Sequence, residues 1–373
     1  MRVLHVLSGL EKGGGERVAV ELANITSENN HTVSMIAGWP EDPSLLQHRL
    51  SEKIQLRFIS SHKNTAYSKT IFWVFKNRNW ICSHDIIHCH LTYGAVFGSV
   101  VRILLKFILR KKIPVILETN HAVGMAPSKF KRWIHTRLIL QMDGMVLMAT
   151  DPFWLTFINN HKHIKTTVIP NGIDLINKTE DLRKNEKLLS IYNIPDDHSY
   201  LIGSISLLRP ERKAWQYVLI FKEVLDKLGK NIHFLLAGSG DEQERIENLI
   251  KENALENNFH LIGLISEPAA FLSGLDMYVS IAVGATAGIS MIEAAMCKLP
   301  VVAVQLDDQY KRKDEDWIWA DADLSKVAEK IISLLTNQDE CFAYRENQYN
   351  YVINNFTNDV MFRSYEKFYK ELL

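Results

Sequence analysis

The feature that most constrains the fold is a repeated alternation of short apolar runs with segments long enough to form helices. A strand followed by a helical crossover pairs in parallel with the next strand, so this alternation predicts a doubly wound α/β sheet. In the first half of the chain, a helix is expected at 16–24 and strands are expected at 2–7, 32–38, 85–89, 115–118, 144–148 and 167–169.

The alternation stops near residue 170 and restarts near residue 200. The turn-forming run Pro170-Asn171-Gly172-Ile173-Asp174 is followed by a polar stretch, 177–187, without apolar periodicity, which predicts a domain junction. Beyond it, strands are expected at 200–206, 231–237, 259–262, 276–280 and 300–304, and helices at 215–228, 241–252, 267–273, 289–297 and 361–373.

This pattern predicts two Rossmann-like domains, residues 1–174 and 175–355. Residues 356–373 are expected to form a helix that crosses back to the first domain. Doubly wound sheets bind ligands beyond the carboxyl ends of their strands, so the two domains are expected to face each other across a binding cleft.

Charge is distributed unevenly along the chain. Residues 1–170 contain 21 Lys+Arg and 11 Asp+Glu, a net charge of +10, and the remainder carries −10. This asymmetry favours an anionic acceptor or an anionic membrane surface for the N-terminal domain, with chance and surface solubility as the alternative. Basic residues that punctuate apolar or aromatic stretches predict peripheral membrane binding: Arg102, Lys106, Arg110, Lys111 and Lys112, and Lys129, Lys131 and Arg132 near Trp133.

Neither a transmembrane helix nor a signal peptide is predicted. The apolar run 3–10 is too short, and the run 95–109 is interrupted by Arg102 and Lys106. The four cysteines form no C-x-x-C pair, which predicts a reduced, cytosolic protein without structural zinc.

Glycine-containing turns precede two of the expected helices. Gly13, Gly14 and Gly15 follow the first strand, where three glycines allow a ligand to approach the backbone or simply form a flexible turn. The small residues of 284–290 precede the helix that contains Glu293. A helix N-terminus of this kind binds phosphate, and Glu293 could accept hydrogen bonds from a ribose diol. The alternative is an ordinary solvated glutamate in a first helical turn.

Charged and imidazole side chains follow several strands. Arg209, Arg212 and Lys213 could neutralise a diphosphate, or they could form a solvated loop. His121 could bind substrate or transfer protons, and His88 and His90 end another strand; packed histidines are the alternative. The sequence shows no H-E-x-x-H motif, and neither a metal site nor a cofactor is predicted.

Taken together, these motifs resemble the retaining GT-B glycosyltransferases of family 4, also called glycosyl transferases group 1. The resemblance covers almost the whole chain. It is carried by Gly13–Gly15, the segments 85–90, 119–121, 169–174, 208–213 and 235–240, and most specifically by 288–302, G-I-S-M-I-E-A-A-M-C-K-L-P-V-V.

The resemblance implies a transferase that moves a hexose from a UDP- or GDP-linked donor to a saccharide or lipid-linked acceptor, without a metal. It implies synthesis of a cell-surface polysaccharide or glycoconjugate, in the cytoplasm or on the inner membrane face. It assigns catalysis to His121, Arg209 and Lys213, and it assigns donor binding to Gly14, Gly15, Leu264, Thr286, Gly288, Ile289 and Glu293.

The chain departs from the family pattern at two positions. Ala285 stands where the family usually carries a glutamate that reaches the donor sugar, and Leu207 stands where an arginine is expected. The alternatives are therefore another GT-B enzyme, such as a sugar-nucleotide epimerase, and a non-catalytic relative that binds nucleotide-sugars.

Overall fold

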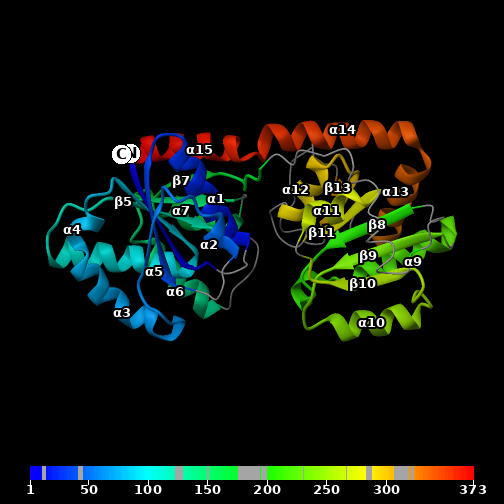
Figure 1. Cartoon of the computed structure of the whole chain (residues 1–373), viewed down its shortest axis with the longest axis horizontal. Helices are drawn as coiled ribbons and strands as arrows, with labels where there is room; N and C mark the ends of the chain where they lie inside the picture. The colour runs from blue at the N-terminus through cyan, green and yellow to red at the C-terminus, as the bar shows by residue number, and fades with distance from the viewer. Residues whose placement is uncertain are drawn as a thin grey trace. The chain divides into compact units, whose positions relative to one another are not determined.

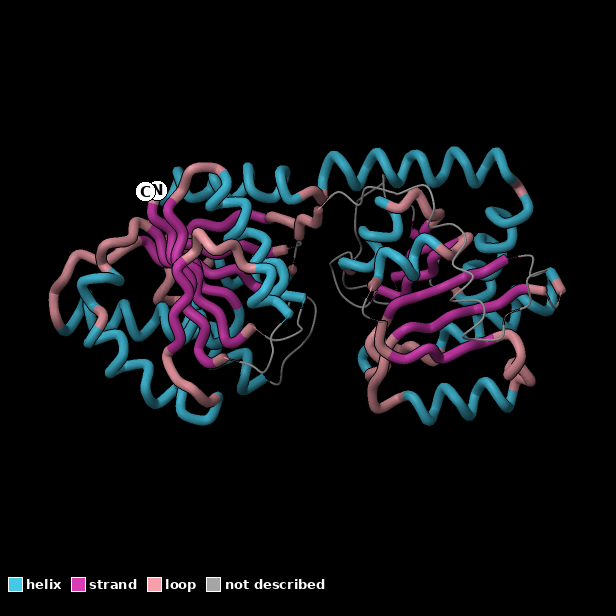
Figure 2. Tube along the Cα trace, in the orientation of Figure 1, coloured by secondary structure: helices cyan, strands magenta, loops and turns pink. Residues whose placement is uncertain are grey.

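The computed structural model describes residues 1–10, 14–40, 45–121, 129–148, 151–174, 194, 200–229, 231–265, 267–282, 288–305, 319–320 and 323–373. The chain forms two compact units. Unit 1 comprises Met1–Ile173 together with Phe356–Leu373, and unit 2 comprises Asp174–Asn355. Within each unit, helices flank the strands of one sheet (Figures 1 and 2).

The sheet of unit 1 is entirely parallel, with strand order β3-β2-β1-β4-β5-β6-β7. Its strands are β1 (Arg2–Gly9), β2 (Thr32–Trp39), β3 (Gln55–Phe58), β4 (Ile86–His90), β5 (Val115–Asn120), β6 (Gly144–Leu147) and β7 (Lys165–Val168). Its helices are α1 (Gly14–Glu28), α2 (Leu45–Arg49), α3 (Lys63–Lys76), α4 (Arg78–Ile81), α5 (Leu91–Val101), the π-helix η1 (Arg102–Ile108), α6 (Lys129–Ile139), α7 (Pro152–Asn159) and α15 (Asn358–Leu372).

The sheet of unit 2 is also parallel, with strand order β10-β9-β8-β11-β12-β13. Its strands are β8 (Tyr200–Ile205), β9 (Ile232–Ala237), β10 (Phe259–Gly263), β11 (Met277–Ala282), β12 (Val301–Gln305) and β13 (Trp319–Ala320). Its helices are η3 (Pro210–Arg212), α9 (Gln216–Leu228), α10 (Gln243–Glu252), α11 (Pro268–Ser273), α12 (Ile289–Met296), α13 (Leu324–Thr336) and α14 (Gln338–Asn355).

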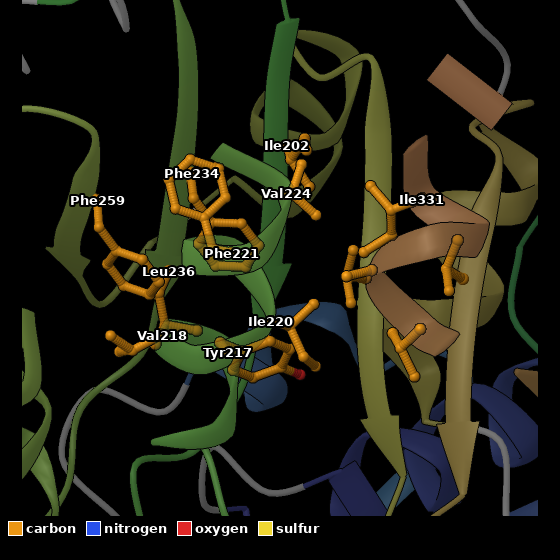
Figure 3. Close-up of a cluster of buried hydrophobic side chains, with 14 of the residues drawn as sticks. Ile202, Tyr217, Val218, Ile220, Phe221, Val224, Phe234, Leu236, Phe259 and Ile331 are labelled. Atoms are coloured by element: carbon orange, nitrogen blue, oxygen red, sulfur yellow. The ribbon is translucent and has the colours of Figure 1, made fainter. Parts of the chain in front are cut away.

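Aromatic side chains fill the core of unit 2 between α9 and the sheet. Phe234 of β9 packs against Phe221 of α9 at 5.4 Å between ring centroids and against Phe259 of β10 at 4.8 Å. Figure 3 shows these rings together with Tyr217 and Ile202 in one continuous cluster. This packing holds the strands β8, β9 and β10 together beneath α9.

Two strands were missed by the sequence pattern, and one was misplaced. β3 and β13 are short edge strands. β3 is of mixed polarity and β13 has only two residues, so neither has the apolar run by which the other strands are recognised. The strand expected at 167–169 lies at Lys165–Val168.

The apolar segment of unit 1 is longer than expected. α5 and η1 together place Leu91–Ile108 in one helical stretch, which is long and apolar enough to cross a membrane. Half of this stretch is buried inside the protein, and α5 packs on β1, β4 and β5. Arg102 is buried and pairs with Asp143, so it does not belong to a membrane-facing surface as the sequence suggested. Core packing accounts for the buried half of this segment, whereas Ile103, Phe107 and Ile108 are exposed.

The end of the chain returns to unit 1. Ile173 forms a parallel bridge with Thr357, and α15 then packs against α1 (Figure 1). Gly172 permits this return, because a Cβ atom there would lie 2.7 Å from the Thr357 carbonyl oxygen. Tyr365 and Tyr369 of α15 are buried in unit 1.

Candidate active site

In unit 2 the strand order reverses between β8 and β11, and the loops that follow the strands meet at the carboxyl edge. The Leu208 N–H donates to the Ser239 carbonyl at 3.1 Å, and the Leu208 carbonyl accepts from the Glu242 N–H at 2.8 Å. Gly238, with φ of +142°, makes this close approach possible, because a Cβ atom would lie 1.8 Å from the Ser206 carbonyl oxygen. Open sheets of this type bind ligands at such a reversal.

A pocket of about 510 Å³ lies between these two loops. Arg209 lines it, but the pocket is not uniformly basic, because Glu211 and Asp241 line it too. Lys213 is exposed beside it and adopts a left-handed backbone conformation, with φ of +50°. Residues other than glycine seldom adopt this backbone conformation, and those that do are concentrated at functional loops.

The second loop at the reversal leads into α12. Gly288 caps the helix in an extended conformation, and Ile289 is its first residue. Glu293 is only 6% exposed, so the alternative of a solvated first-turn glutamate is wrong. Leu264, directly after β10, is 77% exposed. Thr286 and Ala285 lie outside the described residues.

Two tyrosines that the sequence analysis did not single out hold these loops. The Tyr278 hydroxyl donates to the Ser290 hydroxyl at 2.9 Å and accepts from the Ile205 N–H at 3.2 Å, which connects α12 to the end of β8. The Tyr217 hydroxyl accepts from the Ile281 N–H at 2.9 Å. Burial raises the pKa of both phenols, so both hydroxyls stay protonated. From the sequence alone, a tyrosine that links two loops cannot be told apart from any other tyrosine of a hydrophobic core.

In unit 1 the strand order reverses between β1 and β4, and predicted site residues gather there. α1 begins at Gly14, and the next residue, Gly15, packs against His121. A Cβ atom on Gly15 would lie 3.1 Å from both His121 Cγ and Leu91 Cδ2. Leu91, which follows β4, has φ of +61°, an outlier for a bulky residue.

His121 belongs to a larger group of imidazoles. Its Nε2 lies 3.2 Å from His90 Nδ1, and His90 Nε2 lies 3.0 Å from His5 Nδ1. Burial lowers the pKa of His121 to about 4 and that of His5 to about 3. Burial, followed by the neighbouring imidazoles, also holds the pKa of His90 well below its usual range. These three side chains are therefore neutral at physiological pH.

His88 completes the group, and it is the one most tightly held. Its Nδ1 bonds to the Tyr369 hydroxyl and its Nε2 to the Thr119 hydroxyl, each at 2.7 Å. One ring nitrogen each from His5, His88 and His90 lies within 4.8 Å of the other two, a spacing that could hold a metal ion. No linear motif predicted this, because the residues come from two different strands.

In each unit the strand order reverses at a switch point, and glycines and polar groups lie there at the carboxyl edge of a parallel sheet. Two such units define a two-domain Rossmann-like protein of the GT-B class. Residues 12–176 match the family model for Glycosyltransferase Family 4, and residues 186–351 match that for Glycosyl transferases group 1. The chain therefore belongs to the GT-B glycosyltransferases.

The relatives agree with this assignment. The chain is 25% identical to an O-antigen biosynthesis glycosyltransferase of Escherichia coli, over 77% of this chain and 79% of the relative. It is also 25% identical to the 2-deoxystreptamine N-acetyl-D-glucosaminyltransferase of Niallia circulans, over 90% and 91%. Among solved structures, Anabaena HepE in complex with UDP and glucose matches all of both chains, with a TM-score of 0.78 and 16% identity.

Proposed function

We propose that this glycosyltransferase moves a hexose from a UDP- or GDP-linked donor to a saccharide or lipid-linked acceptor in cell-surface polysaccharide synthesis. The E. coli relative acts in O-antigen synthesis, and the Anabaena structure holds UDP, which supports both parts of the proposal. The observation that carries it is the buried carboxylate of Glu293 in the first turns of α12, at the switch point of unit 2.

The donor-binding part rests on charge and geometry. The exposed N–H groups of a helix N-terminus attract phosphate, so Gly288 and Ile289 would meet the diphosphate, together with Thr286. Glu293 would accept hydrogen bonds from the ribose hydroxyls. Lys213, assisted by Arg209, would stabilise the negative charge that grows on the leaving diphosphate.

We propose that the reaction proceeds with retention and without a metal or other cofactor. The acceptor hydroxyl would attack the anomeric carbon on the face that the leaving group vacates. The bond to the phosphate oxygen would break, and that oxygen would take the hydroxyl proton. His121, with Gly14 and Gly15 beside it, would bind the transferred sugar as a neutral imidazole, since its lowered pKa removes it as a cationic acid.

Ala285 favours an unusual donor sugar. A methyl group removes the acceptor that a glutamate would supply, and it leaves room for a sugar that is bulkier, deoxygenated or acidic. An epimerase would release an isomerised sugar, and a non-catalytic relative would bind without turnover, so an assay for transfer separates all three.

We also propose that the protein works in the cytoplasm, bound peripherally to the inner face of the membrane through unit 1. Helices α3, η1 and α6 cover the face of the sheet that includes Leu4 and Val6. They expose large apolar side chains: Tyr67, Ile71, Phe72, Phe75, Ile103, Phe107, Ile108, Phe130, Trp133 and Ile134. Lys69, Lys106 and Lys131 are exposed on the same helices, a composition suited to an anionic interface.

The test of the donor site is calorimetric titration of the full-length protein with UDP. Glu293→Gln keeps the side-chain volume but removes the charge, and a hydrogen bond to a charged group contributes about 1.5–3 kcal/mol. UDP should therefore bind at least about tenfold more weakly. Glu346→Gln is the matched control, because Glu346 lies on α14, outside the proposed site, where it pairs with Lys298.

The same preparation should transfer sugar from UDP- or GDP-hexoses to a lipid-linked acceptor, with undiminished rate in EDTA. Unchanged UDP affinity in a folded Glu293→Gln variant would remove Glu293 from the site. Inactivation by EDTA with recovery on adding manganese would contradict metal independence.

A further inference from the structure

Three imidazoles form a continuous hydrogen-bonded chain through unit 1. His5 lies on β1, His90 ends β4 and His121 follows β5 directly. The register places His5 opposite His88 and His90 opposite Thr119, so these side chains share the face of the sheet that α15 covers. The links are His5 Nδ1 to His90 Nε2 at 3.0 Å and His90 Nδ1 to His121 Nε2 at 3.2 Å.

The protonation of this chain follows from its connectivity. Each neutral imidazole carries one N–H, so one ring nitrogen donates and the other accepts. Both hydrogen bonds must then run in the same direction, either from His5 to His121 or from His121 to His5. The two terminal nitrogens, His5 Nε2 and His121 Nδ1, are buried and have no hydrogen-bond partner among the described residues.

Both terminal nitrogens are buried, so the direction is selected by the end of the chain at which a ligand can supply an acceptor. A buried N–H without an acceptor is rarer in proteins than a buried acceptor without a donor. A sugar oxygen at His121 would accept from an Nδ1–H there, whereas an N–H on His5 Nε2 would have no acceptor among the described residues. We therefore take His5 Nε2 as the bare acceptor, with His5 Nδ1 donating to His90. His90 Nδ1 then donates to His121 Nε2, which leaves the proton of His121 on Nδ1, beside Gly15.

We propose that His5 and His90 are positioning residues that hold His121 in the Nδ1–H tautomer, so that it donates a hydrogen bond to an oxygen of the donor sugar. This inference rests on the proposed function, because it assumes that the sugar lies at His121. Neither His5 nor His90 needs to touch the sugar. Their effect is to exclude the other tautomer, which would present a lone pair to a hydroxyl.

A metal site in the same group is the competing assignment. Both nitrogens of His88 bond to hydroxyls, and both nitrogens of His90 bond to imidazoles. Of the six ring nitrogens of His5, His88 and His90, only His5 Nε2 lacks a partner among the described residues, so a metal ion would have to break several hydrogen bonds. The hydrogen-bonded chain needs no such rearrangement.

The experiment is a long-range ¹H–¹⁵N correlation spectrum of the full-length, histidine-labelled protein without ligand, with His121 assigned from the His121→Gln spectrum. We expect His121 to be protonated at Nδ1 in the wild type. In His5→Phe, His121 should shift toward a mixture of tautomers. The buried His84→Gln, which instead removes bonds to Ser34 and Trp80, should leave His121 unchanged.

Sugar transfer gives the second measurement. His5→Phe should lower kcat by at least about tenfold, with less change in donor KM. The reason is that His5 orients His121 without itself contacting the sugar, and loss of such an orienting group has an effect of this size. His121 protonated at Nε2 in the wild type, or an unchanged tautomer in folded His5→Phe, would overturn the proposal. Stoichiometric zinc binding that depends on His88 would also overturn the proposal. A fixed tautomer in a protein that neither binds nor transfers a nucleotide-sugar would instead overturn the proposed function.

Discussion

Among the glycines that the structure describes, Gly238 has the least room for a side chain. A Cβ atom there would lie 1.8 Å from the Ser206 carbonyl oxygen, whereas one on Gly229, which also has positive φ, would meet nothing within 4 Å. Gly238→Ala should therefore lower the free energy of unfolding by roughly 2–4 kcal/mol, and Gly229→Ala by about 1 kcal/mol. Urea unfolding of the two variants measures the difference. Equal losses would mean that backbone strain, not the close approach of the two loops, makes Gly238 necessary.

The second residue-level prediction concerns an ion pair between α6 and β5. His135 Nε2 lies 2.7 Å from Oε1 of the buried Glu118. Burial lowers the pKa of His135, but the charge and hydrogen bond of Glu118 outweigh burial, so the pKa is raised above its usual value. The charged form is thus favoured by folding. Its stabilisation is complete below the unfolded-state pKa of about 6.5 and is lost as the pH rises through the folded-state pKa.

His135→Gln should remove this dependence. We expect it to cost roughly 1–3 kcal/mol at pH 6 and less as the pH rises toward 9. Thermal unfolding of both proteins across this range is the measurement, with the exposed His48→Gln as the control for loss of an imidazole. A cost that grows with rising pH would contradict the raised pKa.

At the scale of secondary-structure elements, the exposed surface of α3, η1 and α6 predicts binding to anionic membranes. Exposed cations near an anionic membrane contribute about 1 kcal/mol each, so Lys106→Gln combined with Lys131→Gln should weaken vesicle binding roughly 30-fold at low salt. Co-flotation with vesicles containing phosphatidylserine measures this. The control is Lys227→Gln combined with Lys251→Gln, both on helices of unit 2. Wild-type flotation that is no better with anionic than with neutral vesicles would exclude the surface.

For the whole molecule, the return of α15 makes unit 1 depend on the last residues of the chain. Met361, Phe362, Tyr365, Phe368 and Tyr369 are all buried. Burying a large apolar side chain contributes about 1.5–3 kcal/mol, so together they match the total stability of a typical domain. Truncation after Asn355 should leave unit 1 unprotected from hydrogen exchange, while unit 2 keeps its protection.

Tyr369→Phe is the matched point variant for this truncation. It removes one hydrogen bond, to His88, and should cost only about 1–3 kcal/mol without unfolding unit 1. Full protection of unit 1 in the truncated chain would show that α15 is dispensable for its fold.

Local features determined much of this molecule without tertiary information. Apolar runs and turn residues depend on neighbours in sequence. The two parallel sheets could therefore be predicted, together with the strands after which Arg209, Gly288 and His121 follow. The edge strand β3 could not, because four residues of mixed polarity carry no periodic signal.

What the sequence alone could not determine was which strand ends meet. His5 looked like an ordinary residue of a buried strand, and His88 and His90 like a strand terminus. The order β1-β4-β5 brings them beside His121. Likewise, only packing made Tyr278 the link between β8 and α12. Strand order and register are set by contacts between segments far apart in the chain, and a single sequence holds no local trace of them.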